Sequence, residues 1–240
     1  MSWVDVRRGG WDTETTGLEI ETDRIVTAAV VFTGGGQPDK TFTWLINPGM
    51  PSHPKAIETH GITDDRAAAD GQDPKSALDD LAGKLAAALD YGMPLVGFNV
   101  AFDWSILDRD LTRNGLPSMA ERLTRPLVGL VDGLVIDKTL DRYRKGSRKL
   151  EAVAAHYGVA LEKAHTADAD AWAALGVADR LMDAFPQLAA MSAEELFTRQ
   201  QSWAADIAAG LQSYFRSERA GEKQDANAVI DGSWPLRGES

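Results

Sequence analysis

The chain has 240 residues with 44% hydrophobic residues, which supports a folded core in one large domain, with or without an appendage, and excludes disorder throughout. It contains no cysteine, which excludes disulfides, thiolate metal sites and a cysteine nucleophile, and leaves oxygen or imidazole ligands for a metal such as Mg or Mn. The formal net charge of −11 at pH 7 argues against tight, nonspecific coating of long nucleic acid, although it allows a local basic groove.

The first distinctive stretch is WDTETTG at residues 11–17, which places two acids one residue apart. On a strand, side chains two residues apart share a face, so the carboxylates of Asp12 and Glu14 would point the same way and repel each other. The preceding residues, VDVRRGGW, contain two glycines and two arginines. A strand there is expected either to be short or to have Arg7 and Arg8 reaching solvent.

The following segments predict a β-hairpin and then alternating helices and strands. β-branched and aromatic residues at 24–35 and 41–49, joined by a short Gly/Pro/Asp turn, predict the hairpin. Leucines at helical spacing predict a helix over 74–92, and PLVGFN at 94–99 predicts a short buried strand. Residues 101–115 then predict a helix that stops at its final glycine.

The pattern continues with LVIDKTL at 134–140, which is interpreted as a strand running into a helix. A short helix from Leu150 ends at Gly158, and the strongest helix extends from about Ala167 to Phe185. A hairpin followed by alternating strands and helices predicts a mixed α/β sandwich.

A second pattern begins after Pro186. Ser192 and Glu195 form a capping box, and an apolar stripe predicts a long helix that must cover a surface. That surface is either the chain's own domain or a partner. SWPL at 233–236 is apolar enough to dock. We therefore divide the chain into a domain at 1–186 and a C-terminal helix and tail at 187–240.

Two further acids stand where apolar neighbours predict core. Asp103 lies one turn into the helix that follows a buried strand, and Asp170 lies in the first turn of the strongest helix, with Thr166 as its N-cap. Asp168 is explained by the helix dipole alone, and each other acid has a structural alternative as a dipole partner or turn former. Burying several carboxylates together is costly unless a cation neutralises them. A pair of Mg or Mn ions, the arrangement used for phosphodiester cleavage, would do so.

The histidines differ in what they suggest. His53 and His156 are expected to be structural or solvated. His60 ends a short helix before Gly61, where the dipole favours an imidazole. His165 lies just outside the helix start, near Asp170, where a titrating base could take a proton from water.

Three segments in order carry a resemblance to a known family: DTETTG at 12–17, NVAFD at 99–103 and HTADADA at 165–171. They match the patterns D-x-E-T-T-G, N-x-x-F-D and H-x-A-x-x-D-A. The chain resembles the DEDDh 3′–5′ exonucleases, the group that includes the proofreading epsilon subunit of bacterial DNA polymerase III. The resemblance covers roughly 10–185, with HGIT at 60–63 as a further landmark.

The resemblance implies a role for several residues. The carboxylates that would bind two Mg²⁺ or Mn²⁺ ions are Asp12, Glu14, Asp103 and Asp170. His165 would be the general base. The residues that would contact the 3′-terminal nucleotide, through a turn whose backbone can approach it and through two side chains, are Thr15, Thr16, Gly17, His60 and Phe102. Asp137 resembles a family position near the site but is interpreted as structural.

The implied fold is ribonuclease-H-like: a central mixed five-stranded sheet flanked by helices, here with a C-terminal helical extension. The implied reaction is hydrolysis of the 3′-terminal phosphodiester of DNA, which releases nucleoside 5′-monophosphates, in proofreading, DNA replication or DNA repair. The expected partner is a single-stranded DNA 3′ end, with a DNA polymerase or clamp as a possible second partner through the C-terminal helix.

Two alternatives stay open for the function. An exoribonuclease, such as an oligoribonuclease or a ribonuclease T-like enzyme, would use the same site. A non-catalytic polymerase-accessory module would be expected to have lost an acid or His165, and none is lost.

The basic run RYRKGSRK at 142–149 is either a solvated loop or a track for the substrate backbone. The N-terminus shows no apolar signal region, and no run approaches the ~18 to 20 apolar residues of a membrane span, so the cytoplasm is expected.

Overall fold

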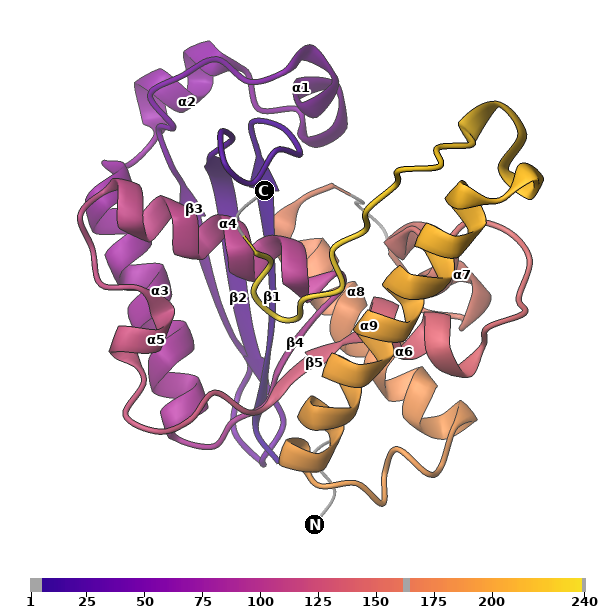
Figure 1. The fold of residues 1–240 in the computed structure, drawn as a ribbon. Helices are drawn as coiled ribbons and strands as arrows, with labels where there is room; N and C mark the ends of the chain where they lie inside the picture. The colour runs from indigo at the N-terminus through magenta and orange to yellow at the C-terminus, as the bar shows by residue number, and fades with distance from the viewer. Residues whose placement is uncertain (1–5, 162–164, 239–240) are drawn as a thin grey trace.

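A computed structural model of the chain describes residues 6–161 and 165–238 (Figure 1). Within these residues, five strands form one sheet in the order β3-β2-β1-β4-β5. Their bounds are Arg8–Thr15 for β1, Ile25–Thr33 for β2, Lys40–Leu45 for β3, Leu95–Gly97 for β4 and Leu130–Asp132 for β5. β3, β2 and β1 are antiparallel neighbours, whereas β1, β4 and β5 run parallel. The predicted mixed five-stranded sheet is therefore confirmed.

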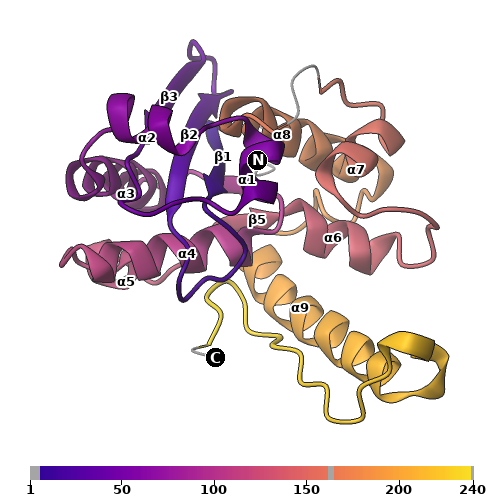
Figure 2. The ribbon, with the colours of Figure 1, turned by 90° about the horizontal axis from the view of Figure 1, so that it is seen from above.

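Helices cover both faces of the sheet (Figure 2). The bounds are Pro54–His60 for α1, Asp64–Asp70 for α2, Pro74–Asp90 for α3, Val100–Arg113 for α4, Met119–Arg122 for α5, Gly133–Leu140 for α6, Leu150–His156 for α7, Ala167–Ala184 for α8 and Ala193–Arg216 for α9. A 3₁₀ helix, η1, follows at Glu218–Lys223. α3 and α4 pack on one face and α8 on the other, each over its own apolar core. No helix in the described residues is long and apolar enough to cross a membrane.

Gly10 of β1 allows a helix to lie directly against the central strand. A Cβ on Gly10 would stand 2.6 Å from the carbonyl oxygen of Ala171 and 2.7 Å from Leu175 Cγ, both on α8. No side chain fits in that space. The absence of a side chain at Gly10 therefore brings the start of α8 close to the acids of β1.

The first strand is neither short nor flanked by two solvated arginines, contrary to the prediction from the sequence. β1 is eight residues long, and Arg8 is buried rather than solvated. Its Nη1 and Nη2 atoms lie 2.6 and 2.7 Å from the two carboxylate oxygens of Asp179 on α8. Arg7 instead donates hydrogen bonds to carbonyl groups of the β2–β3 turn, including Pro38 at 3.0 Å. The buried cation thus has the partner that its burial requires.

The predicted hairpin is confirmed by the antiparallel pairing of β2 with β3. The prediction for 134–140 is wrong, because those residues lie wholly in α6 and the strand β5 lies just before them. Asp132 explains the boundary: its side chain accepts hydrogen bonds from the backbone N–H groups of Leu134 and Val135. An acidic N-cap of this kind starts a helix at once.

The C-terminal helix packs back onto the sheet edge. Gln200 on α9 is fully buried, and its amide pairs with two backbone groups of β5: Oε1 accepts from Asp132 N at 2.6 Å, and Nε2 donates to Leu130 O at 2.9 Å. Trp234 in the tail is buried and donates its indole N–H to Asp132 Oδ2 at 3.2 Å. The helix and SWPL both cover the chain's own domain, while the division at 186/187 stays a prediction.

Candidate active site

Three of the predicted acids and His165 line one cavity of about 350 Å³. Asp12 and Glu14 alternate along β1 with the buried residues Trp11 and Thr13, as the two-residue period of a strand requires. Asp170 enters from the first turn of α8, which reaches β1 because Gly10 leaves room. The shared face predicted for Asp12 and Glu14 thus opens onto the cavity.

Asp103 reaches the same strand from α4 but is held behind the cavity. Its Oδ1 accepts a hydrogen bond from Thr13 Oγ1 at 2.6 Å and another from Thr13 N at 3.2 Å. α4 starts here because Asn99, with φ of 74°, turns the chain in the left-handed region and donates its N–H to Asp132 Oδ1 at 3.0 Å. Asp103 is therefore a buried neighbour of Asp12 across the strand.

Burial raises the pKa of all four acids, and the other acids of the set raise those of Asp12 and Glu14 further. Burial and the charges of Asp103, Glu14 and Asp170 raise the pKa of Asp12 well above its usual value. Burial, followed by repulsion from Asp170 and Asp103, raises the pKa of Glu14 to about 8. Burial raises the pKa of Asp103 to about 7 and that of Asp170 to about 6, against hydrogen bonds from Thr13 and His165 respectively. Such a cluster holds protons because burial disfavours the charged form of each carboxylate.

The donor set fits a divalent cation. Glu14, His165 and Asp170 each offer a ligand atom, and these atoms lie within 4.8 Å of one another. Asp170 Oδ1 is buried and, among the described residues, has no hydrogen-bond partner. Burial and the neighbouring acids both raise the pKa of Asp12 and of Glu14. Carboxylate oxygens are the ligands that Mg²⁺ and Mn²⁺ prefer.

His165 is held at the cavity by two acids. Its backbone N–H donates to Asp170 Oδ2 at 3.2 Å, with φ of 68° placing it in the left-handed region. Its Nε2 lies 2.9 Å from Glu151 Oε1 on α7. In the tautomer whose Nε2–H donates to this carboxylate, Nδ1 is the ring nitrogen with a free lone pair. Sequence reasoning missed Glu151, since an acid in the first turn of a helix is already explained by the dipole.

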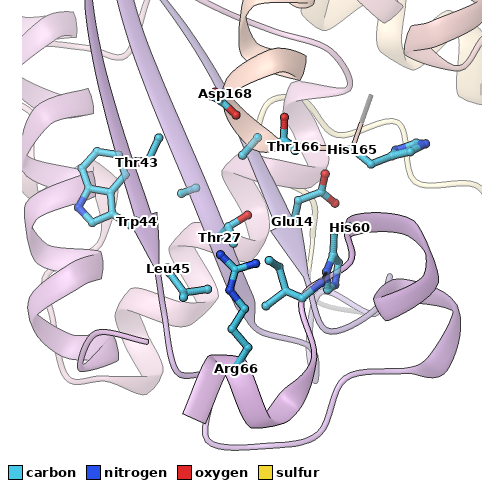
Figure 3. A pocket seen from close by; sticks show the side chains of 13 residues that line it. Glu14, Thr27, Thr43, Trp44, Leu45, His60, Arg66, His165, Thr166 and Asp168 are labelled. Carbon is cyan, nitrogen blue, oxygen red and sulfur yellow. Dashed lines mark hydrogen bonds between the residues drawn. The ribbon is translucent and has the colours of Figure 1, made fainter. Parts of the chain in front are cut away.

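A second cavity of about 240 Å³ lies beside the first and shares Glu14 and His165 with it (Figure 3). Side chains of β2, β3 and the segment from α1 to α2 line it, including Thr27, His60 and Arg66. His60 is buried, and its Nδ1 accepts a hydrogen bond from Ile62 N at 3.0 Å. Burial lowers the pKa of His60, against the opposite effects of the Thr15 backbone and the Asp64 charge, and so favours a neutral ring, whose Nε2 is buried.

The TTG turn uses its side chains internally. Thr15 Oγ1 donates to Gly17 O at 2.6 Å, and Thr16 Oγ1 donates to Asp23 Oδ1 at 2.8 Å. A Cβ on Gly17 would overlap the His53 ring and the Asp23 carboxylate. The turn is buried, and its backbone is bonded as well: Thr16 N donates to Arg24 O, and Thr16 O accepts from His53 N, each at 2.8 Å. Within the described part of the chain, Thr15, Thr16, Gly17 and Phe102 line neither cavity, and Phe102 packs against the core.

The basic run divides into two groups. Asp137, fully buried in α6, lies 2.9 Å from Arg144 Nη2 and 2.7 Å from Arg148 Nη1, and accepts a hydrogen bond from Tyr157 OH at 3.2 Å. This arrangement agrees with the structural role expected of Asp137. Arg148 and Lys149 also line the larger cavity, so the end of the basic run borders the acids.

Comparison with known proteins relates the chain to exonucleases. The model of the exonuclease family RNase_T matches residues 10–178. A DNA polymerase III of PolC type from Lacticaseibacillus paracasei is 34% identical over 161 residues, which cover 67% of this chain and 10% of that protein. A protein of the same name from Lactococcus lactis is 31% identical over 196 residues, 80% of this chain and 10% of that protein. The chain thus spans about a tenth of these relatives.

Solved structures share the fold. A zinc-bound complex of Escherichia coli ExoI with single-stranded DNA superposes with a TM-score of 0.64 at 21% identity, covering 77% of this chain and 42% of the other. A moderately thermophilic exonuclease I from Methylocaldum szegediense gives a TM-score of 0.62 at 23% identity, covering 76% and 42%. At these identities the likeness establishes the fold alone.

Proposed function

The chain belongs to the RNase_T exonuclease family, and from this premise we propose that it hydrolyses the 3′-terminal phosphodiester of single-stranded DNA and releases nucleoside 5′-monophosphates. One observation carries the proposal. Asp12, Glu14 and Asp170 share an open cavity with His165, and burial raises the pKa of each of the three acids. A site so arranged is suited to cation-assisted hydrolysis of an anionic substrate.

The carboxylates of Asp12, Glu14, Asp103 and Asp170 would hold the two divalent ions, Mg²⁺ or Mn²⁺. When bound, such ions supply an activated water nucleophile and stabilise charge on the attacking and leaving oxygens. Glu14 and Asp170 are placed for this because both open onto the cavity. Asp103 would contribute from behind the cavity, where its two hydrogen bonds from Thr13 orient its carboxylate.

His165 would be the general base. Its Nδ1 takes a proton from the attacking water, whose oxygen bonds to the terminal phosphorus while the bond to the 3′ oxygen of the preceding nucleotide breaks. That 3′ oxygen leaves and is protonated. Glu151 acts as a positioning residue, because its carboxylate holds Nε2 at 2.9 Å and so fixes which nitrogen accepts the proton.

The terminal nucleotide would bind between the TTG turn and the smaller cavity. Thr15 to Gly17 are assigned this role from the family resemblance, because in the structure they are buried and Thr16 N and O pair with Arg24 and His53. His60 would donate its Nε2–H to the nucleotide from the cavity that it shares with Glu14 (Figure 3). Phe102 would contribute an apolar contact from the first turn of α4.

The relatives favour DNA and a place in replication. The named relatives are DNA polymerases, and a solved neighbour holds single-stranded DNA. Proofreading or end processing beside a polymerase is therefore the physiological role that we propose. A polymerase or clamp contact through α9 would be confined to its C-terminal end, where Leu211 and Tyr214 are partly exposed, because the start of the helix covers β5.

Digestion of end-labelled oligonucleotides tests the proposal. Single-stranded DNA labelled at the 3′ or the 5′ end, beside the matching RNA, is incubated with Mg²⁺, with Mn²⁺ and with EDTA. We expect early release of labelled mononucleotide from the 3′ end of DNA, abolished by EDTA. Faster cleavage of RNA would instead support the exoribonuclease. No release from either substrate would support the accessory module.

A further inference from the structure

The basic run at 142–149 contains more cations than its ion pairs with Asp137 use. Of its five cations, Arg144 and Arg148 turn inward onto Asp137. Arg142, Lys145 and Lys149 remain exposed, and none of the three forms an ion pair with an acid in the described ranges. On a chain with a net charge of −11, this segment is a local site where a polyanion can bind favourably.

An aromatic side chain stands among these cations. Tyr143 is 90% exposed, although a tyrosine gains free energy when its ring is covered. Arg142 lies over the ring, with its guanidinium carbon 6.0 Å from the ring centroid. Cations interleaved with an exposed aromatic ring form the kind of surface that binds single strands, because phosphates pair with the cations and bases stack on the ring.

The loop is continuous with the proposed catalytic cavity. Lys149 is the N-cap of α7 and lines the cavity together with Asp12 and Asp170. From there the chain leads back to Lys145 over four residues, a reach of at most ~14 Å. Figure 2 shows this segment on the outer side of α6 and α7. A strand whose 3′ end occupies the cavity could therefore continue along the loop.

The loop at 142–149 is also held in place before any strand binds. Arg144 and Arg148 join its two ends to the buried carboxylate of Asp137, and Arg148 donates to Asp141 O through Nη2 at 2.6 Å. These bonds hold the segment in one arrangement, so binding costs less conformational entropy than it would in a free loop.

We propose that the loop at 142–149 binds the single strand on the 5′ side of the reacting nucleotide. Lys149 contacts the phosphate nearest the cavity, Lys145 and Arg142 contact phosphates further along, and a base stacks on Tyr143. This inference rests on the proposed nuclease function. It predicts that the enzyme prefers a strand long enough to reach the loop over a single nucleotide ester.

The test compares two substrates and two charge-matched variants. One substrate is a single-stranded oligothymidylate. The other is the p-nitrophenyl ester of thymidine 5′-monophosphate, which has no nucleotides to reach the loop. The test variant is Arg142→Ala with Lys145→Ala. Its control is Arg180→Ala with Arg199→Ala, which removes the same charge from exposed helical positions.

We expect the test pair to raise KM for the oligonucleotide about tenfold relative to the control pair. A plot of the logarithm of the association constant against the logarithm of the salt concentration should also become less steep by about 1.4, since each phosphate contact to a single strand contributes ~0.7 to that slope. The rate on the ester should fall no more than in the control. Tyr143→Ala should raise KM about fivefold or more through lost stacking, and Tyr143→Phe should restore it.

The inference and the nuclease proposal fail in different ways. An oligonucleotide KM and salt slope that match the control would overturn the loop's role while leaving the nuclease intact. If the wild type cleaves neither substrate, the nuclease proposal fails. Fluorescence anisotropy of a labelled oligonucleotide then decides the loop's role alone: weaker binding by the test pair than by the control supports it, and equal binding overturns it.

Discussion

Glu151 Oε1 lies 2.9 Å from His165 Nε2, so the proposed general base is oriented by a carboxylate from a different helix. α7 carries Glu151 in its first turn and packs against α8, whose start follows His165. The contact therefore depends on the packing of two helices rather than on the HTADADA segment alone. It orients a side chain that is 41% exposed and would otherwise sample several rotamers.

Glu151→Ala should lower kcat, because His165 would lose the acceptor that selects Nδ1 as its basic nitrogen. His165→Ala sets the upper limit for this decrease, because loss of a positioned general base lowers kcat by a factor of about 10² to 10⁴. Glu151→Gln, which keeps an acceptor oxygen, should recover part of the rate. The measurement is kcat as a function of pH for all three variants. An unchanged kcat and pH profile for Glu151→Ala would remove Glu151 from the mechanism.

Asp170→Asn should abolish metal-dependent cleavage without unfolding the protein. The substitution removes a charge that repels Asp12 and Glu14 and that burial disfavours, since burial raises the pKa of Asp170 to about 6. The melting temperature of the metal-free variant should therefore be no lower than that of the wild type. Stabilisation by added Mg²⁺ should weaken or disappear. Retained activity would show that the two-ion assignment is wrong.

Stability of the metal-free protein should fall as pH rises from about 5 to about 8. The folded-state pKa values of Glu14 and Asp103 are raised to about 8 and about 7, above their unfolded values. Between the unfolded and folded values the folded state binds more protons, so the free energy of unfolding decreases with pH. The stability from these groups is fully present below the unfolded pKa and is lost as pH passes the folded one.

Urea unfolding across this pH range in EDTA measures the slope directly. Glu14→Gln should reduce the slope because a neutral side chain replaces the group with a pKa of about 8. Saturating Mg²⁺ should reduce it in the wild type as well, since ligands must be deprotonated to bind. A slope of the opposite sign in the metal-free protein would mean that the acids are already compensated.

Gly10→Ala should weaken both folding and catalysis. The new Cβ would meet the backbone of α8 at Ala171, so the helix must move away, at a cost of about 1–3 kcal/mol for overpacking. Because α8 carries Asp170, activity should fall as well. Gly9→Ala is the matched control: its nearest neighbours are side-chain atoms of Leu95 and Phe32, which can shift. Equal effects of the two substitutions on unfolding and on activity would contradict this account.

The acids and the order of elements could be predicted from the sequence because they depend on local patterns. Apolar periodicity located α3 and α8, and three short motifs located Asp12, Asp103 and Asp170. The partner of Arg8 could not be predicted, since Asp179 lies 171 residues away and nothing local marks the pair. The N-cap role of Asp132 was missed for a different reason: a short apolar run does not distinguish a strand from a helix.

The sequence placed Gln200 only within a predicted long helix, yet its amide pairs with two backbone groups of β5. Gln200→Ala should therefore leave Asp132 N and Leu130 O buried without partners, a cost of about 1–3 kcal/mol for each group. Gln201→Ala is the control, because the neighbouring glutamine is exposed. Chemical denaturation should show a large loss for Gln200→Ala and almost none for Gln201→Ala.

A second measurement separates the edge contact from general helix stability. Asp132 also accepts the indole N–H of Trp234, so loosening β5 should free the tail and increase the exposure of that tryptophan to acrylamide quenching. We expect a change in quenching for Gln200→Ala before global unfolding and none for Gln201→Ala. If the two variants had equal stability and equal quenching, α9 would be an appendage that the sheet does not need. The division at 186/187 would then also mark a boundary in folding.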